Sequence, residues 1–310
     1  MDEALDLIRS GCGREGTALL TRTLAEQRLV LDAEGWKRCV ADMLRHPIRE
    51  YIHADPFTFR AFSKPRGYAG DAVMMDYVYG HQAESLAAPV DEIFAYTTED
   101  GHAPRAIRTR RDVLAQTIDR LAIDRSGGID VIAIAAGHLR EMERSSAAAQ
   151  GLVQITALDA DEESLAVVND AYGRLGASTL HGSVRQILSG KVRLQPSDLI
   201  YSAGLYDYLT RPVATRLTTM LFGALRPGGT LLLANFLPDI QDVGYMECFM
   251  DWHLIYRTDR EMLALTDALP PGEVADVRQF HDPLDNITFL EITRRSATGL
   301  AAPSGAARIS

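Results

Sequence analysis

The stretch Val131-Ile132-Ala133-Ile134-Ala135-Ala136-Gly137-His138-Leu139 decides the fold. It is a short aliphatic run that reaches a glycine, and the charged pair Arg140-Glu141 then opens a helical pattern. Further apolar runs follow, separated by helical patterns: Val153–Leu158, Leu199–Ala203, Thr230–Ala234 and Asn286–Ile292. Strands that alternate with helices predict βαβ units and a parallel sheet, whose strands are apolar throughout because both faces are covered. We therefore predict an α/β fold with a doubly wound, mostly parallel sheet.

The residues before this sheet have a different pattern. Apolar residues recur at helical spacing up to about Met43, and a mixed segment with the turn-forming run Lys64–Asp71 follows. Pro104 then begins an amphipathic helix whose apolar face holds Ile107, Leu114, Ile118 and Leu121. We predict a helical cap over residues 1–103, a sheet domain over residues 104–295, and a disordered tail over residues 296–310.

Charge and composition exclude several classes of partner. The net charge is -10, which repels nucleic acid phosphates and anionic membranes. The acidic start Met1-Asp2-Glu3-Ala4 does not resemble a signal peptide, and no apolar stretch approaches the roughly 20 residues of a membrane span. Cys12, Cys39 and Cys248 lie far apart, without a C-x-x-C pair. We predict a cytoplasmic protein that binds no nucleic acid, membrane or metal, and the sequence is compatible with a homodimer.

The end of the second predicted strand carries the first functional signal. Asp159 follows Val153–Leu158, and a carboxylate at this position can accept hydrogen bonds from both ribose hydroxyls of an adenosine. It lies roughly 20 residues after Gly137, the spacing of a nucleotide-binding βαβ unit. A nicotinamide dehydrogenase is disfavoured because the G-x-G-x-x-G fingerprint is absent.

Five motifs occur in a familiar order between residues 105 and 293. They are Val131–Leu139, Ala157–Asp161, His181–Val184, Ser197–Tyr208 and Leu225–Thr230. In this order the chain resembles the class I S-adenosylmethionine (SAM)-dependent methyltransferases. The resemblance implies a seven-stranded, Rossmann-like sheet with an antiparallel terminal hairpin, and SAM as the cofactor. It implies the following cofactor-binding residues in the sheet domain: Ala135, Gly137, His138, Asp159, Ala160, Gly182, Ser183, Val184, Ser202 and Ala203.

The first motif departs from the family pattern. Ala133 stands where the family has an acidic residue, and Ala135 and Leu139 replace two of its glycines. The methionine end of SAM must therefore be held differently, by the backbone near Gly137, by His138 and by groups of the cap. Within the cap, Arg66 could pair with the SAM carboxylate and Tyr68 could lie near the sulfonium.

Two runs resemble a narrower subgroup of these enzymes. The run Lys64–Asp71, together with Met250–Arg257, is similar to hydroxy fatty acid methyl ester synthases and to enzymes that cyclise SAM to azetidine-2-carboxylate. On the acceptor side we expect Tyr206, Tyr208, Asp251, Trp252 and His253 to cluster. We predict catalytic roles for Tyr68, Tyr206, Asp251 and His253, the last as a general base if the acceptor must lose a proton.

Three functions follow from these observations. The first is methyl transfer from SAM to a small natural-product or lipid-like acceptor. The second is cyclisation of SAM alone to azetidine-2-carboxylate and 5′-methylthioadenosine, which needs a tight pocket and a neutral amine. The third is a non-catalytic SAM-binding module, favoured by the lost glycines and disfavoured by the retained Asp159.

Overall fold

The computed structural model describes residues 1–81, 85–125 and 128–296. Within these residues the chain forms a seven-stranded sheet with the order β3-β2-β1-β4-β5-β7-β6. The strands are β1 (Ile129–Ile134), β2 (Val153–Asp159), β3 (Ala177–His181), β4 (Ser197–Ser202), β5 (Leu225–Phe236), β6 (Val274–His281) and β7 (Ile287–Arg294). Strands β1 to β5 are parallel, and β7 is antiparallel to both of its neighbours. The predicted fold class is confirmed.

Strand β3 has no counterpart among the predicted apolar runs. Its sequence Ala177-Ser178-Thr179-Leu180-His181 lies at the edge of the sheet, and none of its residues is fully buried. An edge strand that faces solvent lacks the continuous apolar run that marks the central strands. The run Pro227-Gly228-Gly229 of the motif Leu225–Thr230 lies inside β5, where the pairing with β4 shifts its register.

Helices cover both faces of the sheet, as a doubly wound fold requires. One face packs against α8 (His102–Asp124), α9 (Ser146–Ala149) and α10 (Glu162–Tyr172). The other packs against α11 (Val184–Leu188), α12 (Arg211–Gly223) and α14 (Asp259–Leu263). Short 3₁₀ segments occur at η2 (Arg140–Glu143), η3 (Gly173–Leu175), η4 (Tyr206–Tyr208) and η5 (Ala264–Thr266).

The amino-terminal region is helical, as predicted. It contains α1 (Asp2–Arg9), α2 (Gly13–Val30), α3 (Ala33–Met43), α4 (Ile48–Ile52), α5 (Pro56–Ser63), α6 (Ala72–Val78), α7 (Val90–Ala95) and the π-helical turn η1 (Tyr96–Asp100). Aspartate side chains cap the amino-terminal ends of three of these helices. They accept hydrogen bonds from backbone N–H groups in the first helical turn: Asp32 in α3, Asp55 in α5 and Asp71 in α6.

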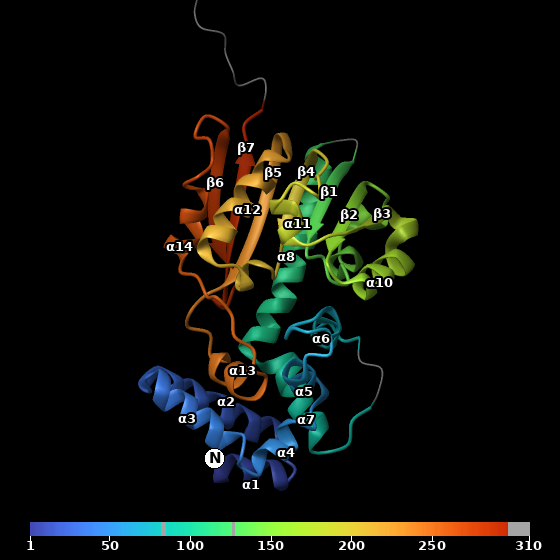
Figure 1. The fold of residues 1–310 in the computed structure, drawn as a ribbon. Coiled ribbons are helices and arrows are strands. Elements are labelled where there is room, and N and C mark those ends of the chain that lie inside the picture. The colour runs from blue at the N-terminus through green and yellow to red at the C-terminus, as the bar shows by residue number, and fades with distance from the viewer. Residues whose placement is uncertain (82–84, 126–127, 297–310) are drawn as a thin grey trace, which may run out of the picture.

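Two later helices join this region to the sheet. Figure 1 shows the sheet in the upper part of the molecule, the amino-terminal helices below, and α8 running between them. Helix α13 (Val243–Phe249) follows β5 in the chain but packs against α2 and α3. Its Glu247 accepts hydrogen bonds from Arg28 and Trp36, both at 2.7 Å. The helical region therefore includes a segment from the second half of the chain, and the predicted division at residue 103 describes only the order along the sequence.

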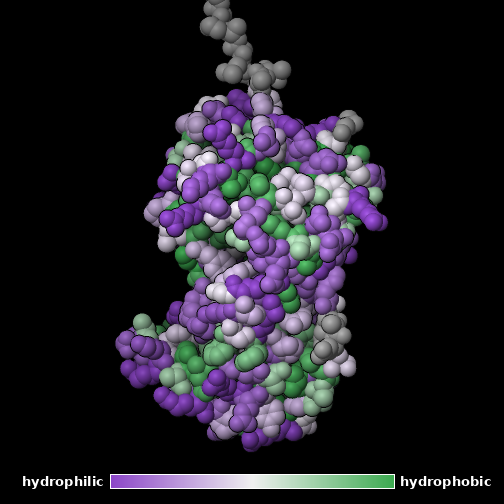
Figure 2. Space-filling view, turned by 45° about the vertical axis from the view of Figure 1, so that its right-hand side comes forward, coloured by the Kyte–Doolittle hydropathy of each residue, from purple (hydrophilic) through white to green (hydrophobic). Residues whose placement is uncertain are grey.

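The surface narrows where the helical region meets the sheet region, and hydrophobic side chains appear on it in small groups (Figure 2). None of the helices in the described ranges combines the length and the apolar composition needed to cross a bilayer. The predicted tail, apart from residue 296, lies outside the described residues.

Candidate functional site

A cavity of about 1060 Å³ lies at the carboxyl ends of β1, β2 and β4. In the sheet order β1 stands between β2 and β4, so this is the point where the chain reverses its direction of winding. Open α/β sheets bind their ligands at such a switch point. The cavity is also covered by residues of α8 and of the segment between α5 and α6, so both regions of the molecule build it.

The residue at the end of β2 is held rigidly. One Asp159 oxygen, Oδ2, accepts a hydrogen bond from the backbone N–H of Gly137 at 2.8 Å, and Oδ1 accepts one from Asp161 N–H at 2.9 Å. Each oxygen has lone pairs left for further donors. Asp159, Ala160 and Gly137 all line the cavity, so the structure brings these predicted residues together.

The loop after β1 has three left-handed residues, although only one of them, Gly137, is a glycine. Ala135, Gly137 and Leu139 have φ of 54°, 54° and 56°. A left-handed backbone costs a residue with a Cβ about 1–2 kcal/mol, and such strain collects at functional sites. The two glycine replacements that we noted in the sequence therefore leave the left-handed turns in place.

A second predicted loop lies beside Asp159. Gly182, Ser183 and Val184 line the cavity, and Gly182 N–H donates to the Asp159 carbonyl at 2.8 Å. The Ser183 side chain caps α11 in a reciprocal capping box with Gln186. Its hydroxyl and its backbone N–H are thus both engaged within the protein.

Arg66 is placed differently from the prediction. It lines the cavity, but its guanidinium donates to Asp161 at 2.7 Å, to Ser164 at 3.0 Å and to Glu163 at 3.0 Å. These acceptors belong to the start of α10, so Arg66 fastens the cap to the sheet region. In this structure the Arg66 guanidinium is thus engaged by acidic side chains, and its predicted contact with the SAM carboxylate stays a prediction.

Tyr68 lines the cavity near the same carboxylates. Burial, and then the negative charges of Asp159 and Asp161, raise the pKa of its phenol above the ordinary value. The hydroxyl therefore stays protonated and is available as a hydrogen-bond donor.

His138 belongs to a three-residue network. Its Nδ1 lies 2.8 Å from Asp76 Oδ2, and Arg140 binds both oxygens of Asp76 at 2.7 Å. Burial opposes the ionisation of Asp76, but the hydrogen bonds from Arg140 and His138 lower its pKa to about 2. Asp76 is thus a carboxylate, and among the described residues the buried Nε2 of His138 has no hydrogen-bond partner.

The inner end of the cavity contains two charged residues that sequence reasoning missed. Arg110 and Asp207 are 6% and 2% exposed, both line the cavity, and Arg110 Nη1 lies 4.0 Å from Asp207 Oδ2. Arg110 donates to the Ala203 carbonyl at 2.9 Å, and Asp207 Oδ1 accepts from Phe236 N–H at 2.8 Å. Burial raises the pKa of Asp207 to about 7, against the opposing effect of Arg110. A signal existed for Arg110, since it lies on the apolar face of α8 between Ile107 and Leu114.

A buried carboxyl–phenol pair lies next to this end. Tyr201 donates a hydrogen bond to Glu141, and both residues line the cavity. Burial raises the pKa of Glu141, although the Tyr201 hydrogen bond opposes this effect.

Four predicted residues do not face the cavity. Tyr206 is buried in the core on the other side of the sheet and bonds to Thr218 at 3.0 Å. The Ser202 hydroxyl donates to the Ile134 carbonyl. Asp251 and His253 lie on the surface, where Asp251 pairs with Lys64 and with His253. The structure therefore does not bring Tyr206, Asp251 and His253 together with the predicted residues that line the cavity.

Two residues that are close to these in the sequence, Tyr208 and Trp252, do reach the cavity. Tyr208 and Trp252 line it, and the Trp252 indole N–H donates to the Tyr208 hydroxyl at 2.7 Å. The Tyr208 hydroxyl in turn donates to the Ala69 carbonyl at 3.0 Å. Both side chains thus form a roof that joins the cap segment to the sheet region.

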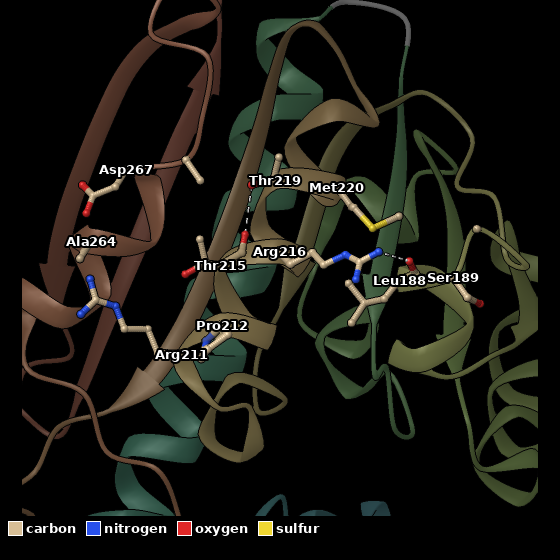
Figure 3. A pocket seen from close by; sticks show the side chains of 12 residues that line it. Leu188, Ser189, Arg211, Pro212, Thr215, Arg216, Thr219, Met220, Ala264 and Asp267 are labelled. Atoms are coloured by element: carbon tan, nitrogen blue, oxygen red, sulfur yellow. Dashed lines mark hydrogen bonds between the residues drawn. The ribbon is translucent and has the colours of Figure 1, made fainter.

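A second hollow of about 990 Å³ lies on the outer side of α12, next to α11 and η5. Figure 3 shows its lining, in which Arg216 donates to the Leu188 carbonyl and Thr219 to the Thr215 carbonyl. It contains none of the predicted site residues and lies away from the carboxyl ends of the strands. The first cavity is therefore the candidate site. Within the described ranges, no cluster of three or more His, Cys, Asp or Glu side chains could hold a metal ion.

No protein-family model matches the sequence, and no curated protein matches it significantly. Among solved structures, the chain is similar to a possible exported protein from Bordetella parapertussis, with a TM-score of 0.59 and 17% identity over 86% of this chain and 100% of that chain. It is also similar to magnesium protoporphyrin IX methyltransferase from Synechocystis with bound SAH (TM-score 0.48, 11% identity, 73% of this chain and 96% of that chain). A 1,6-didemethyltoxoflavin-N1-methyltransferase from Burkholderia thailandensis is similar with a TM-score of 0.43 and 16% identity, over 69% of this chain and 93% of that chain. The likeness to the Bordetella parapertussis structure, at 17% identity, concerns the fold alone.

Proposed function

We propose that this chain binds SAM in the cavity at the ends of β1, β2 and β4 and transfers its methyl group to a small-molecule acceptor. One observation supports this proposal more strongly than the others. Asp159 ends β2 beside a left-handed loop, and backbone N–H groups hold both of its carboxylate oxygens in place. A carboxylate so placed is suited to the two ribose hydroxyls of an adenosine.

The residues that line the cavity fit the parts of SAM. Asp159 would hold the ribose, and the backbone of Gly182–Val184 would flank the adenine. Gly137 and His138 would lie beside the amino acid arm, since they continue the loop away from Asp159. SAM supplies a methyl group on a sulfonium. The chain's own contribution is to orient the two reactants and to exclude water, which are the main requirements of an in-line displacement.

The roof of the cavity supports a small acceptor. Tyr208, Trp252 and the segment at Ala69 and Gly70 cover the inner end, and the amino-terminal helices close the molecule on that side. A protein or nucleic acid substrate would need an open approach to this end. The net charge of -10 further disfavours nucleic acid. We retain as expectations the cytoplasmic location and the compatibility with a homodimer.

Titration calorimetry with S-adenosylhomocysteine (SAH) tests the proposal. Asp159→Ala should weaken SAH binding by about 10- to 100-fold, because hydrogen bonds to a charged group are lost. Asp170→Ala is the matched control, since Asp170 is an exposed carboxylate on α10 outside the cavity. Equal affinity of Asp159→Ala and the wild type would remove Asp159 as the ribose ligand and contradict the proposed site.

Cyclisation of SAM to azetidine-2-carboxylate remains the second candidate. The observation that favours it is the aromatic inner end, where Tyr79, Tyr201, Tyr208 and Phe236 line the same cavity. Such a wall could bend the amino acid arm so that the amine reaches the carbon bonded to sulfur. Incubation of the protein with SAM alone, followed by mass spectrometry, separates the candidates. Methylthioadenosine with a four-carbon cyclic amino acid indicates the cyclase, whereas SAH formed only with added acceptors indicates a methyltransferase. SAM that binds but stays intact throughout would favour the non-catalytic module.

A further inference from the structure

The side chain of Asp207 has one oxygen to which the protein supplies no donor. Asp207 is 2% exposed and lines the candidate cavity. Its Oδ1 accepts a hydrogen bond from Phe236 N–H at 2.8 Å, but among the described residues no group donates to Oδ2. Arg110 Nη1 lies 4.0 Å from Oδ2, which is beyond hydrogen-bond distance. A buried carboxylate oxygen without a donor is costly, so a donor from a ligand would account for it.

The second oxygen of Asp207 is open to the cavity. Some polar side-chain atoms of the described residues lack both a hydrogen-bond partner and accessible surface, and none of them belongs to Asp207. Oδ2 has no partner, so it must keep accessible surface. Because Asp207 lines the cavity, this surface faces the space for a ligand.

The surroundings of Asp207 indicate the body of such a ligand. Ile107, Leu114, Tyr79, Tyr201 and Phe236 line the same cavity. Aromatic and aliphatic walls of this kind favour a flat, apolar ring. A carboxylate oxygen accepts hydrogen bonds and cannot donate them, so the ring must carry the donor.

Asp207 lies on the acceptor side of the proposed cofactor. Asp159 would hold the ribose at the end of β2, and the adenine would lie toward β3. In the sheet order β3-β2-β1-β4-β5, the methyl group then lies toward β4. Asp207 follows β4 in η4, and its hydrogen bond with Phe236 joins it to the end of β5. A second reactant therefore has Asp207 beside it.

We propose that the methyl acceptor is a small aromatic compound with a hydroxyl or ring N–H group, and that Asp207 Oδ2 accepts a hydrogen bond from this group. The inference rests on the proposed function, since it requires SAM in the same cavity. In the transfer, the acceptor oxygen or nitrogen forms a bond to the methyl carbon. The bond from this carbon to sulfur breaks and its electron pair stays on sulfur, which gives SAH. The acceptor's proton passes to the Asp207 carboxylate.

The charge of Asp207 suits this transfer. Burial raises its pKa to about 7, so carboxylate is present at neutral pH and can take a proton. The groups that interact with it are Arg110 of α8, Arg257, Tyr208 and Tyr256. Both arginines stay charged, and burial raises the pKa of both tyrosines above the ordinary value. Within this set, Asp207 is thus the group whose charge changes between pH 6 and pH 8.

Fluorine nuclear magnetic resonance tests the substrate class on the wild-type chain saturated with SAH. The probes are 4-fluorophenol, which carries a hydroxyl, and 4-fluoroanisole, in which a methyl group has replaced the donor hydrogen. We expect 4-fluorophenol to bind about tenfold more tightly, because its hydroxyl bonds to a charged oxygen. The preference should increase from pH 6 to pH 8 as Asp207 ionises, since a phenol stays protonated at both values. No binding of 4-fluorophenol, equal affinities, or a preference that does not increase with pH would overturn the inference.

Asp207→Asn tests the oxygen itself. The amide oxygen must stay with Phe236 N–H, because the amide NH₂ cannot accept a hydrogen bond. The NH₂ group then faces the cavity in place of Oδ2. Both probes can accept a hydrogen bond from NH₂, so the preference for 4-fluorophenol should disappear at both pH values. Asp170→Asn is the matched control and should keep the preference, since Asp170 is exposed on α10 outside the cavity. A preference that persists in Asp207→Asn would overturn the inference.

Two further measurements identify other partners for this end of the cavity. Tighter binding of 4-fluorobenzoate than of 4-fluorophenol to the wild type would indicate an anion at Arg110 and overturn the inference. Weaker binding of SAH, but not of 5′-methylthioadenosine, to Asp207→Asn would indicate the cofactor's amino group as the donor and also overturn it. In both cases the proposed function stands. If SAH fails to bind the wild type, the proposed function itself fails.

Discussion

At the scale of single residues, the candidate site is marked by charged groups that the core buries. Arg110, Asp207 and Glu141 are almost inaccessible to solvent, yet all three line one cavity. Buried charges are expensive unless they are paired, and they concentrate where a protein binds or transforms a ligand. Asp207 is only loosely paired, since its nearest contact with Arg110 is 4.0 Å. Its protonation should therefore affect the stability of the whole protein.

Asp207→Asn should change the pH dependence of stability. The folded pKa of Asp207 is raised to about 7, whereas an unfolded aspartate titrates near 3.9. The folded state thus holds a proton that the unfolded state has lost, and the wild type loses free energy of unfolding as pH rises from about 4 through 7. The asparagine variant lacks this loss. Urea unfolding at pH 5 and pH 8 should show the variant gaining stability relative to the wild type at the higher pH. A difference that is the same at both pH values would contradict the raised pKa.

At the scale of elements, the segment between α5 and α6, residues 64–71, connects the cap to the site. Asp71 pairs with Arg60 at 2.7 Å, and Arg66 binds the start of α10. At its far end the Ala69 carbonyl accepts the hydrogen bond from Tyr208. The segment is short and has few residues in regular structure, so side-chain contacts to the sheet region hold it over the cavity.

Gly70→Ala should displace this segment from the roof. Gly70 has φ of 75°, and an added Cβ would lie 2.6 Å from a Trp252 ring carbon and 2.9 Å from the Tyr208 hydroxyl. Gly67→Ala is the control for backbone strain alone, since Gly67 has φ of 84° and no atom within 4 Å of an added Cβ. Both variants should lose about 1 kcal/mol of stability from the left-handed backbone.

The two variants should differ at Trp252. In a Trp36→Phe background Trp252 is the remaining tryptophan, so its fluorescence reports on the roof. Gly70→Ala should shift the Trp252 emission and weaken SAH binding, while Gly67→Ala should leave the emission unchanged. The same emission in both variants would mean that the roof tolerates the added methyl group.

At the scale of the whole molecule, the cap and the sheet share one hydrophobic core. A single cluster of buried side chains extends from Leu5 and Leu20 of the amino-terminal helices to Val131 of β1 and Phe289 of β7. Helices α8 and α13 carry this cluster between the two regions. Separating the regions would expose much of it to water, at roughly 25 cal/mol for each Å² of apolar surface. The cap is therefore part of the folding unit.

We predict a single cooperative unfolding transition. Trp36 lies in α3 of the helical region and Trp252 lies over the cavity, so variants that keep one tryptophan report on each region. The fluorescence midpoints of Trp36→Phe and Trp252→Phe in urea should each coincide with the midpoint of far-ultraviolet circular dichroism for the same variant. Loss of the Trp36 signal at a lower urea concentration than the sheet signal would show that the cap unfolds independently.

Local patterns in the sequence determined the class of fold and one end of the candidate site. Apolar runs alternating with helical periods predict the central strands, because the period of a strand or helix is expressed over a few neighbouring residues. The positions of Asp159 and Gly137 follow from the same reasoning, since each lies within a few residues of the end of a predicted strand. The sequence did not predict strand β3, because an exposed edge strand lacks that continuous apolar pattern.

The tertiary structure decided which polar groups are free for a ligand. The Arg66–Asp161 contact joins residues 95 apart in the chain, and through it Arg66 fastens the cap to the start of α10. The Arg110 contact with the Ala203 carbonyl spans 93 residues, and the His138 contact with Asp76 spans 62. Tyr206 and Asp207 are adjacent in sequence, yet one lies in the core behind the sheet and the other lines the cavity. Such pairings depend on how α6, α8 and α10 pack around the sheet, and packing arises from the shape of the whole core, which no short stretch of sequence contains.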